Sequence, residues 1–143
     1  QSKSKISWKK RTNNTSNVLV NKEEEVEVNF QFEEFDKLVF LLENVIKMKN
    51  IESYERYRNV FHNEDIEIVV DKYPFGIALE IENKSKLKTA EETVLFWVKR
   101  LGLKQEDAFR LSWDDKYTEL CKQQNIEIFK HVKFDLPMPK VIE

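Results

Sequence analysis

The chain has 143 residues, of which 41% are hydrophobic and 12% aromatic, and it carries 24 basic and 26 acidic side chains. This composition excludes a disordered chain, and its length predicts one domain over residues 1–143. The formal net charge of −2 argues against a general DNA or RNA binder, which would show a basic excess. No apolar run is long enough to span a bilayer, and the single Cys121 cannot form an intramolecular disulfide. We therefore expect a cytoplasmic protein without a membrane partner.

The first third of the chain predicts two strands and a helix. Residues 6–11 form a short candidate strand, and the polar run at 13–17 indicates a loop. Residues 24–32 alternate apolar and polar side chains, as a strand does. Residues 33–48 then place apolar side chains at spacings of three and four, which predicts a helix with one apolar face.

Three strand-like runs follow, and their connections have the length of hairpin turns. The runs cover residues 53–62, 65–71 and 76–82, so an antiparallel meander is the simplest arrangement. A helix over residues 88–100 begins at Thr89, with Glu92 completing a capping box, and Gly102 ends it. In this helix, an apolar face for packing is predicted from Val94, Phe96, Trp97 and Leu101.

The remaining residues predict one or two short helices over 106–123 and a last strand over 125–135. The predicted order is β-β-α-β-β-β-α-α, with the final strand in addition, which is typical of an α+β fold. Gly76 and Gly102 are the only glycines, so a glycine-rich phosphate loop is excluded. His62 and His131 have no Cys or His at metal-ligand spacing, and we expect both to be structural or exposed.

Each predicted strand is amphipathic, with charged side chains gathered on its polar face, because residues two apart in a strand point to the same side. The basic members are Arg56 and Arg58 in one strand and Lys9 opposite Trp8 in another. The acidic members lie in the other strands; they are Glu25, Glu27, Asp71, Glu80 and Glu82.

Two arrangements of these faces stay open from alternation alone. An open sheet could show its charged face to water, as half-solvated antiparallel sheets do. Alternatively, the sheet could curl into a barrel with a charged interior. Arginine and lysine suit phosphate oxygens, while clustered carboxylates suit Mg²⁺ or Mn²⁺, so a metal-bound polyphosphate would satisfy both signs of charge.

An ordered set of motifs resembles the CYTH superfamily, which contains class IV adenylyl cyclases, thiamine triphosphatases and other triphosphate tunnel metalloenzymes. The segment DIEIVVDKYPFGIALEIE at 65–82 is similar to the family's strand ending in Asp, its short turn and its strand ending in Glu-x-Glu. Upstream, the set includes Ile6-Ser7-Trp8-Lys9, Glu25-Val26-Glu27 and Arg56-Tyr57-Arg58-Asn59-Val60-Phe61. Downstream, it includes Leu101-Gly102-Leu103, Ser112-Trp113 and Tyr117-Thr118-Glu119-Leu120.

The resemblance implies an antiparallel β-barrel, the triphosphate tunnel, with helices packed outside. It implies metal-dependent hydrolysis of a triphosphate or nucleotide substrate, or cyclic AMP synthesis from ATP, with Mg²⁺ or Mn²⁺ as the cofactor. The residues that it assigns to phosphate binding are Lys9, Arg56 and Arg58. The residues that it assigns to catalysis are Glu25 and Glu27. The residues that it assigns to the metal are Asp71, Glu80 and Glu82.

One feature of the family has no counterpart in the sequence. The family's N-terminal strand with Glu-x-Glu-x-Lys and its next, arginine-bearing strand do not occur before Ile6. Without them the predicted barrel is incomplete, and a non-catalytic module that binds a nucleotide or polyphosphate becomes the alternative. A second copy of the chain could replace the missing strands, because edge strands invite pairing, so a homodimer is a further expectation.

Overall fold

A computed structural model describes residues 4–12, 22–49, 52–109 and 111–141. The chain divides into two compact units, which are described separately below. The N-terminal unit is Gln1–Asn17 with Asn21–Ile51, and the C-terminal unit is Val18–Val20 with Glu52–Glu143. The described elements form an α+β fold with small, mostly antiparallel sheets, and no closed barrel is detected among them.

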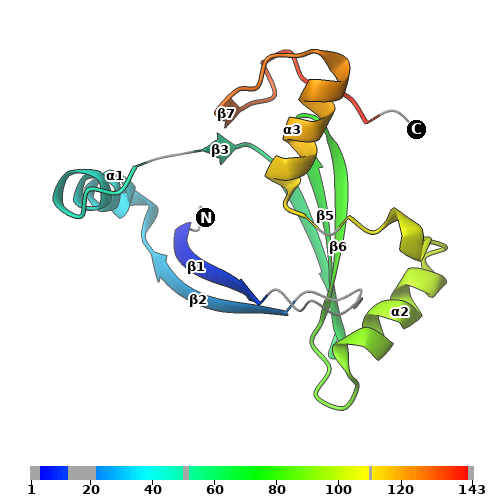
Figure 1. The fold of residues 1–143 in the computed structure, drawn as a ribbon. Coiled ribbons are helices and arrows are strands. Elements are labelled where there is room, and N and C mark those ends of the chain that lie inside the picture. Colours follow the sequence, from blue (N-terminus) through cyan, green and yellow to red (C-terminus); the bar gives the residue numbers. More distant parts are fainter. Residues whose placement is uncertain (1–3, 13–21, 50–51, 110, 142–143) are drawn as a thin grey trace. The chain divides into compact units, whose positions relative to one another are not determined.

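The N-terminal unit contains a two-stranded antiparallel ribbon followed by a helical segment (Figure 1). Strand β1 (Ser4–Thr12) pairs with β2 (Lys22–Phe30). Strand β1 extends the strand predicted over 6–11, whereas β2 begins and ends two residues before the strand predicted over 24–32. The helix predicted over 33–48 is divided into three parts and ends at Val45, so the prediction was wrong at residues 46–48. A 3-10 turn, the short helix α1 (Phe35–Phe40) and a π-helical turn (Leu41–Val45) follow one another.

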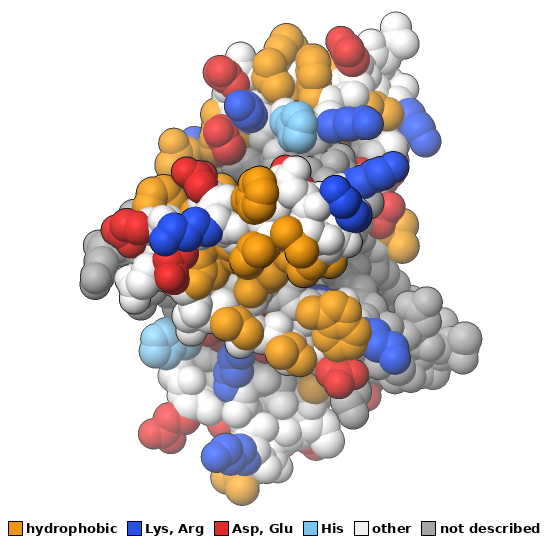
Figure 2. Space-filling model, turned by 90° about the vertical axis from the view of Figure 1, so that its left-hand side faces the viewer, with side chains coloured by type: hydrophobic (Ala, Val, Ile, Leu, Met, Phe, Trp, Pro, Cys, Tyr) orange, Lys and Arg blue, Asp and Glu red, His pale blue; other side chains and the backbone are white. Residues whose placement is uncertain are grey.

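Hydrophobic side chains of the N-terminal unit are exposed on both its ribbon and its helical segment. They include Trp8 and Val26 on the ribbon and Phe40 and Ile46 after it. Figure 2 shows hydrophobic side chains gathered beside charged ones on one side of the surface. Among residues 4–10 and 24–49, whose burial the structure describes, none is buried, so this part of the unit has little core of its own.

The C-terminal unit is built on a three-stranded antiparallel sheet in the order β4-β5-β6. Strands β4 (Tyr57–His62), β5 (Ile66–Tyr73) and β6 (Gly76–Asn83) form the predicted meander. The first turn is fixed by Asn63, whose Oδ1 accepts hydrogen bonds from the backbone N–H groups of Asp65 and Ile66. Pro74 and Phe75 form the second turn.

The core of this unit lies where α3 (Trp113–Gln124) packs on the turn end of the β5–β6 hairpin. Figure 1 shows α3 and α2 (Ala90–Arg100) at opposite ends of the sheet. Aromatic rings stack through the core, with Phe75 in contact with both Tyr73 and Tyr117. Cys121 is fully buried there, as predicted for a small apolar residue.

A parallel pair of two-residue strands, β3 (Ser53–Tyr54) and β7 (His131–Val132), adds to the C-terminal unit. The strand predicted over 53–62 is therefore interrupted at Glu55 and Arg56, which belong to no strand. The strand predicted over 125–135 was wrong except at β7. Asn125 has a positive φ of 53° and ends α3, so no strand begins there. Strand β7 has only two residues because its partner β3 has only two.

Helix α2 confirms the predicted capping signals. Thr89 accepts a hydrogen bond from the backbone N–H of Glu92, and Glu92 bonds back to the Thr89 backbone. Gly102 follows the helix with a φ of 70°, which only glycine adopts readily. The predicted packing face was partly wrong, because Val94 is buried whereas Phe96 and Leu101 are exposed. None of the described helices has the length and apolar character needed to cross a membrane.

Candidate functional site

The strand register brings Arg58, Asp71 and Glu80 onto one face of the three-stranded sheet, and Arg56 comes directly before β4. Arg58 lies opposite Asp71 across β4 and β5, and Asp71 lies opposite Ala78 across β5 and β6. Glu80, two residues beyond Ala78, shares that face. The face therefore gathers charges from all three strands. We call Arg56, Arg58, Asp71, Tyr73 and Glu80 the arginine–aspartate cluster.

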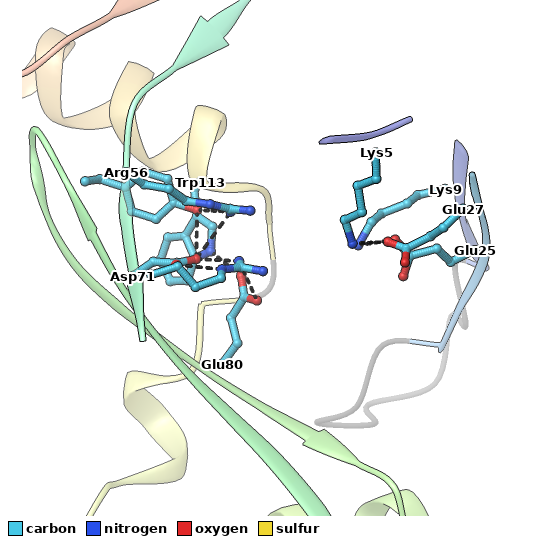
Figure 3. A network of polar contacts seen from close by, with 10 residues as sticks. Lys5, Lys9, Glu25, Glu27, Arg56, Asp71, Glu80 and Trp113 are labelled. Carbon is cyan, nitrogen blue, oxygen red and sulfur yellow. Dashed lines mark hydrogen bonds and ion pairs between the residues drawn. The ribbon is translucent and has the colours of Figure 1, made fainter. Parts of the chain in front are cut away.

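Asp71 is the centre of the arginine–aspartate cluster, and its side chain has 0% exposure. Arg58 binds it through two nitrogens, with Nε 2.8 Å from Oδ1 and Nη2 2.5 Å from Oδ2. Arg56 donates from Nη1 to Asp71 Oδ2 at 3.3 Å and to the Tyr73 hydroxyl at 3.1 Å (Figure 3). A buried carboxylate thus positions both guanidinium groups through charge-assisted hydrogen bonds.

The hydrogen bonds between Asp71 and Arg58 favour the charged forms of both side chains. Burial alone would raise the pKa of Asp71, but hydrogen bonds from Arg58 and the charge of Arg56 outweigh it and keep that pKa below its usual value. The hydrogen bond to Asp71 raises the pKa of the Arg58 guanidinium. Burial raises the pKa of Tyr73 to about 12, so its hydroxyl stays protonated and can donate to Asp71 at 3.4 Å.

Glu80 connects the arginine–aspartate cluster to helix α3. Its Oε1 accepts a hydrogen bond from Trp113 Nε1 at 2.8 Å, and its Oε2 lies 3.7 Å from Arg58 Nη2. Trp113 is held at the first position of α3 by a capping box between Ser112 and Asp115. The helix cap therefore fixes a side chain that positions Glu80.

The sequence did not single out two members of this arrangement. Tyr73 and Trp113 both lie in segments that resemble the family, but the sequence predicted no role for either side chain. Trp113 donates a hydrogen bond to Glu80 although the two residues are 33 positions apart in the sequence. No local sequence pattern could therefore predict this contact.

Glu82 shares the sheet face by alternation but contacts a different residue. Its Oε1 is 2.8 Å from Lys84 Nζ, and its side chain is exposed. No described contact joins it to the arginine–aspartate cluster. Of the three predicted metal ligands, the structure thus brings Asp71 and Glu80 to the arginines and leaves Glu82 farther along β6.

The predicted residues of the N-terminal unit lie on one face of its ribbon. Lys9 pairs with Glu25 at 3.0 Å across β1 and β2, and Lys5 forms an ion pair with Glu27 (Figure 3). The hydrogen bond from Lys5 is the main cause of the lowered pKa of Glu27. Lys9, Glu25 and Glu27 therefore share a charged face, as alternation predicted.

The described carboxylates do not form a preassembled metal centre. Among the residues that the structure describes, no group of three or more His, Cys, Asp or Glu side chains has an arrangement that could hold a metal ion. His62 and His131 are both exposed, and His131 Nδ1 lies 2.8 Å from Ser53 Oγ. The cluster therefore presents the guanidinium groups of Arg56 and Arg58. Its two carboxylates, Asp71 and Glu80, contact these groups.

Comparison with known proteins adds no family, because the chain matches no family model, no curated protein and no solved structure. The resemblance described above therefore stays a prediction that rests on the quoted motifs.

Proposed function

We propose that this chain binds a triphosphate-containing substrate through Arg56 and Arg58 and hydrolyses it with the help of Mg²⁺ or Mn²⁺. The observation that carries the proposal is the buried Asp71, which holds both guanidinium groups on one sheet face. A carboxylate that only balanced a surface charge would not need to be fully buried. Orienting two arginines in advance lowers the entropy lost when they bind a planar or tetrahedral anion.

Both arginines keep part of their surface for a ligand. The side chains of Arg56 and Arg58 are 32% and 35% exposed. Arg58 uses Nε and Nη2 for Asp71, and Arg56 uses Nη1 for Asp71 and Tyr73. These bonds leave Nη1 of Arg58 and both Nε and Nη2 of Arg56, and we assign these nitrogens as donors to phosphate oxygens.

A divalent cation would supply the positive charge that the cluster itself lacks. Two arginines and two carboxylates sum to a formal charge of zero, whereas a triphosphate carries several negative charges. Glu80 and Glu82 follow one another on the same face of β6, and carboxylate oxygens are the ligands that Mg²⁺ and Mn²⁺ prefer. When bound, the metal would neutralise the phosphate oxygens.

The proposed reaction is attack of water on the terminal phosphorus. The oxygen of water bonds to phosphorus, the bridging phosphorus–oxygen bond breaks, and the diphosphate part leaves with the electron pair. Glu25 and Glu27 are the proposed acceptors of the water proton. The proposal includes closure of the charged strand faces into an antiparallel barrel around the substrate.

A phosphate-release assay with inorganic triphosphate tests the hydrolytic part of this proposal. We expect release in the presence of Mn²⁺ or Mg²⁺ that stops with a chelator and falls at least tenfold in Arg56→Gln. Arg100→Gln, which makes the same change on α2, should leave release unchanged. Unchanged release in folded Arg56→Gln would contradict the proposal, and cyclic AMP formed from ATP would favour the cyclase alternative.

A non-catalytic module that binds a nucleotide or polyphosphate is the second candidate function. It is favoured by the ion pairs of the proposed catalytic and metal-binding carboxylates, since Glu25, Glu27 and Glu82 each contact a lysine. A carboxylate held by a lysine must lose that contact before it binds a metal or accepts a proton. Saturable binding of triphosphate without phosphate release would support this alternative.

A further inference from the structure

The two arginines of the arginine–aspartate cluster are positioned in different ways. Arg58 belongs to β4, where the strand register places it opposite Asp71. Arg56 lies in the break between β3 and β4 and belongs to no strand, so no ladder of strand hydrogen bonds fixes its place. The contacts that hold this break therefore determine where the Arg56 guanidinium lies.

The break between β3 and β4 is held by the segment of residues 130–134, which follows α3 along the chain. Its backbone accepts two hydrogen bonds from the residues before Arg56. The Ser53 N–H donates to the Lys130 carbonyl oxygen at 3.0 Å, and the Glu55 N–H donates to the Val132 carbonyl oxygen at 3.0 Å. The chain is thus fixed as far as the residue directly before Arg56.

Two side-chain contacts join the 130–134 segment to the residues on either side of Arg56. Before it, Glu55 Oε2 accepts a hydrogen bond from the Phe134 backbone N–H at 3.2 Å. After it, the ring of Tyr57 lies against the ring of Phe134, with centroids 4.9 Å apart. Both chain neighbours of Arg56 therefore contact the same residue of the segment.

The 130–134 segment is itself anchored in the core of the C-terminal unit. Val132 is 5% exposed and belongs to the same core cluster as Tyr117 of α3. The Phe129 N–H, directly before the segment, donates to the Tyr117 hydroxyl at 3.1 Å. Protein cores are closely packed, so a segment anchored in one gives its contacts a firm base.

Tyr54 extends this support to the guanidinium of Arg56. Tyr54 lies opposite Val132 in the β3–β7 pair. Arg56 Cζ lies over the Tyr54 ring, 5.7 Å from its centroid, and that ring meets the Tyr73 ring edge to face at 5.5 Å. The guanidinium therefore has an aromatic ring from β3 and the carboxylate of Asp71 as its neighbours.

We propose that the 130–134 segment positions Arg56 to bind the triphosphate, with Glu55 as a positioning residue. The inference rests on the proposed function, because it concerns the same phosphate donors. Without the hydrogen bond between Glu55 and Phe134, the chain around Arg56 gains freedom, and its guanidinium must be ordered when the triphosphate binds. Arg58 keeps its place, because the register of β4 holds it.

Two substitutions of Glu55 separate its positioning role from its charge. Glu55→Gln keeps an oxygen that can accept from the Phe134 N–H, whereas Glu55→Ala does not. In isothermal titration with inorganic triphosphate and Mg²⁺, we expect Glu55→Ala to weaken binding at least threefold and Glu55→Gln to bind like the unaltered protein. Glu64→Ala, which removes an exposed carboxylate from the turn between β4 and β5, is the control and should leave affinity unchanged.

A role of Glu55 through charge alone predicts the opposite sign. Removing a carboxylate near a bound triphosphate lessens repulsion, so both Glu55→Ala and Glu55→Gln would then bind it more tightly. Unchanged or tighter binding in folded Glu55→Ala would overturn the proposal.

A double-mutant cycle tests whether the effect passes through Arg56. In the Arg56→Gln background, we expect Glu55→Ala to change triphosphate affinity less than twofold, because the side chain that Glu55 positions is already absent. Equal weakening by Glu55→Ala in both backgrounds would overturn the proposal.

An NMR readout tests the positioning of Arg56 without triphosphate. The Tyr54 ring lies against the Arg56 guanidinium and shifts its Nε–Hε resonance. We expect Glu55→Ala and Phe134→Ala each to move this resonance and to leave that of Arg58 in place.

Phe61→Ala, which removes an exposed ring from β4, is the matched control for Phe134→Ala and should move neither arginine resonance. An unmoved Arg56 resonance in both Glu55→Ala and Phe134→Ala would overturn the proposal, whatever the titrations give. Absence of triphosphate binding to the unaltered protein would instead contradict the proposed function, so the two failures are distinguishable.

Discussion

Asp71 is the residue on which the C-terminal unit depends most. It is fully buried, yet it accepts hydrogen bonds from two arginines and a tyrosine. Removing one member of a buried ion pair leaves the others without compensation, and typically costs about 3–5 kcal/mol. The buried carboxylate is therefore a structural group as well as a support for the proposed ligand site.

We predict that Asp71→Ala lowers the free energy of unfolding by about 3 kcal/mol or more, because Arg56 and Arg58 lose their common acceptor. Urea denaturation followed by circular dichroism measures the change. Asp107→Ala, which removes an exposed carboxylate from the turn Gln105–Asp107, is the control and should change stability by less than about 0.5 kcal/mol. Equal effects of the two substitutions would contradict this description of Asp71.

The lowered pKa of Asp71 also predicts a pH dependence of stability. Because the folded-state pKa lies below the usual value of about 3.9, its contribution is complete above that value and is lost as pH falls through the lowered pKa. We expect unaltered protein to lose more stability than Asp71→Asn as urea denaturation is repeated from pH 6 to pH 3. Parallel pH profiles for the two proteins would show that Asp71 does not contribute in this way.

At the scale of elements, the N-terminal cap of α3 positions a side chain that contacts the candidate site. Ser112 and Asp115 form a capping box that begins α3, and Trp113 at its first position contacts Glu80. We predict that Ser112→Ala lowers the free energy of unfolding by about 1 kcal/mol, because backbone N–H groups of the first turn lose an acceptor. Thermal denaturation measures the change, and Ser112→Asp should restore most of the stability. No loss in Ser112→Ala would show that the cap is dispensable.

The elements that the sequence predicted best are those with a strong local signal. Alternation located β4, β5 and β6, and the Thr89–Glu92 pair located the start of α2. The parallel pairing of β3 with β7 was missed, because its residues are 78 positions apart and each strand has only two residues. Alternation at residues 126 and 128 indicated a strand that has no partner to pair with.

The site was predictable in composition but not in its contacts. Alternation placed Arg56, Arg58 and Glu80 on charged faces, and in the structure Arg58 Nη2 lies 3.7 Å from Glu80 Oε2. The partner of Asp71 was not predictable, because strand register depends on turn geometry and packing along the whole hairpin. Asp71 was expected at a metal, whereas in the structure it binds arginines.

At the scale of the whole molecule, the two units differ in how much core they contain. The buried hydrophobic residues of the described chain all lie between Ile66 and Pro139. The ribbon of β1 and β2 has two strands, and a two-stranded ribbon alone is marginally stable in water. Stability should therefore be concentrated in the C-terminal unit.

We predict that amide hydrogens of β5 exchange with solvent at least tenfold more slowly than those of β1 and β2. Strand β5 is central in its sheet and carries the buried side chains of Ile66, Val69 and Asp71. Hydrogen exchange followed by mass spectrometry or NMR compares the strands within one sample. Equal protection of β1, β2 and β5 would contradict the assignment of the core to the C-terminal unit.

The central claim is that Asp71 orients Arg56 and Arg58 to bind a triphosphate, and isothermal titration tests it most directly. Inorganic triphosphate is titrated with and without Mg²⁺ into unaltered protein, Arg56→Gln and the control Arg100→Gln. Arg56→Gln is chosen because Asp71 keeps both of its bonds to Arg58 in that variant. We predict saturable binding that Mg²⁺ strengthens, that Arg56→Gln weakens at least tenfold and that Arg100→Gln leaves unchanged. Absence of binding to the folded protein, or equal affinity in Arg56→Gln, would contradict the claim.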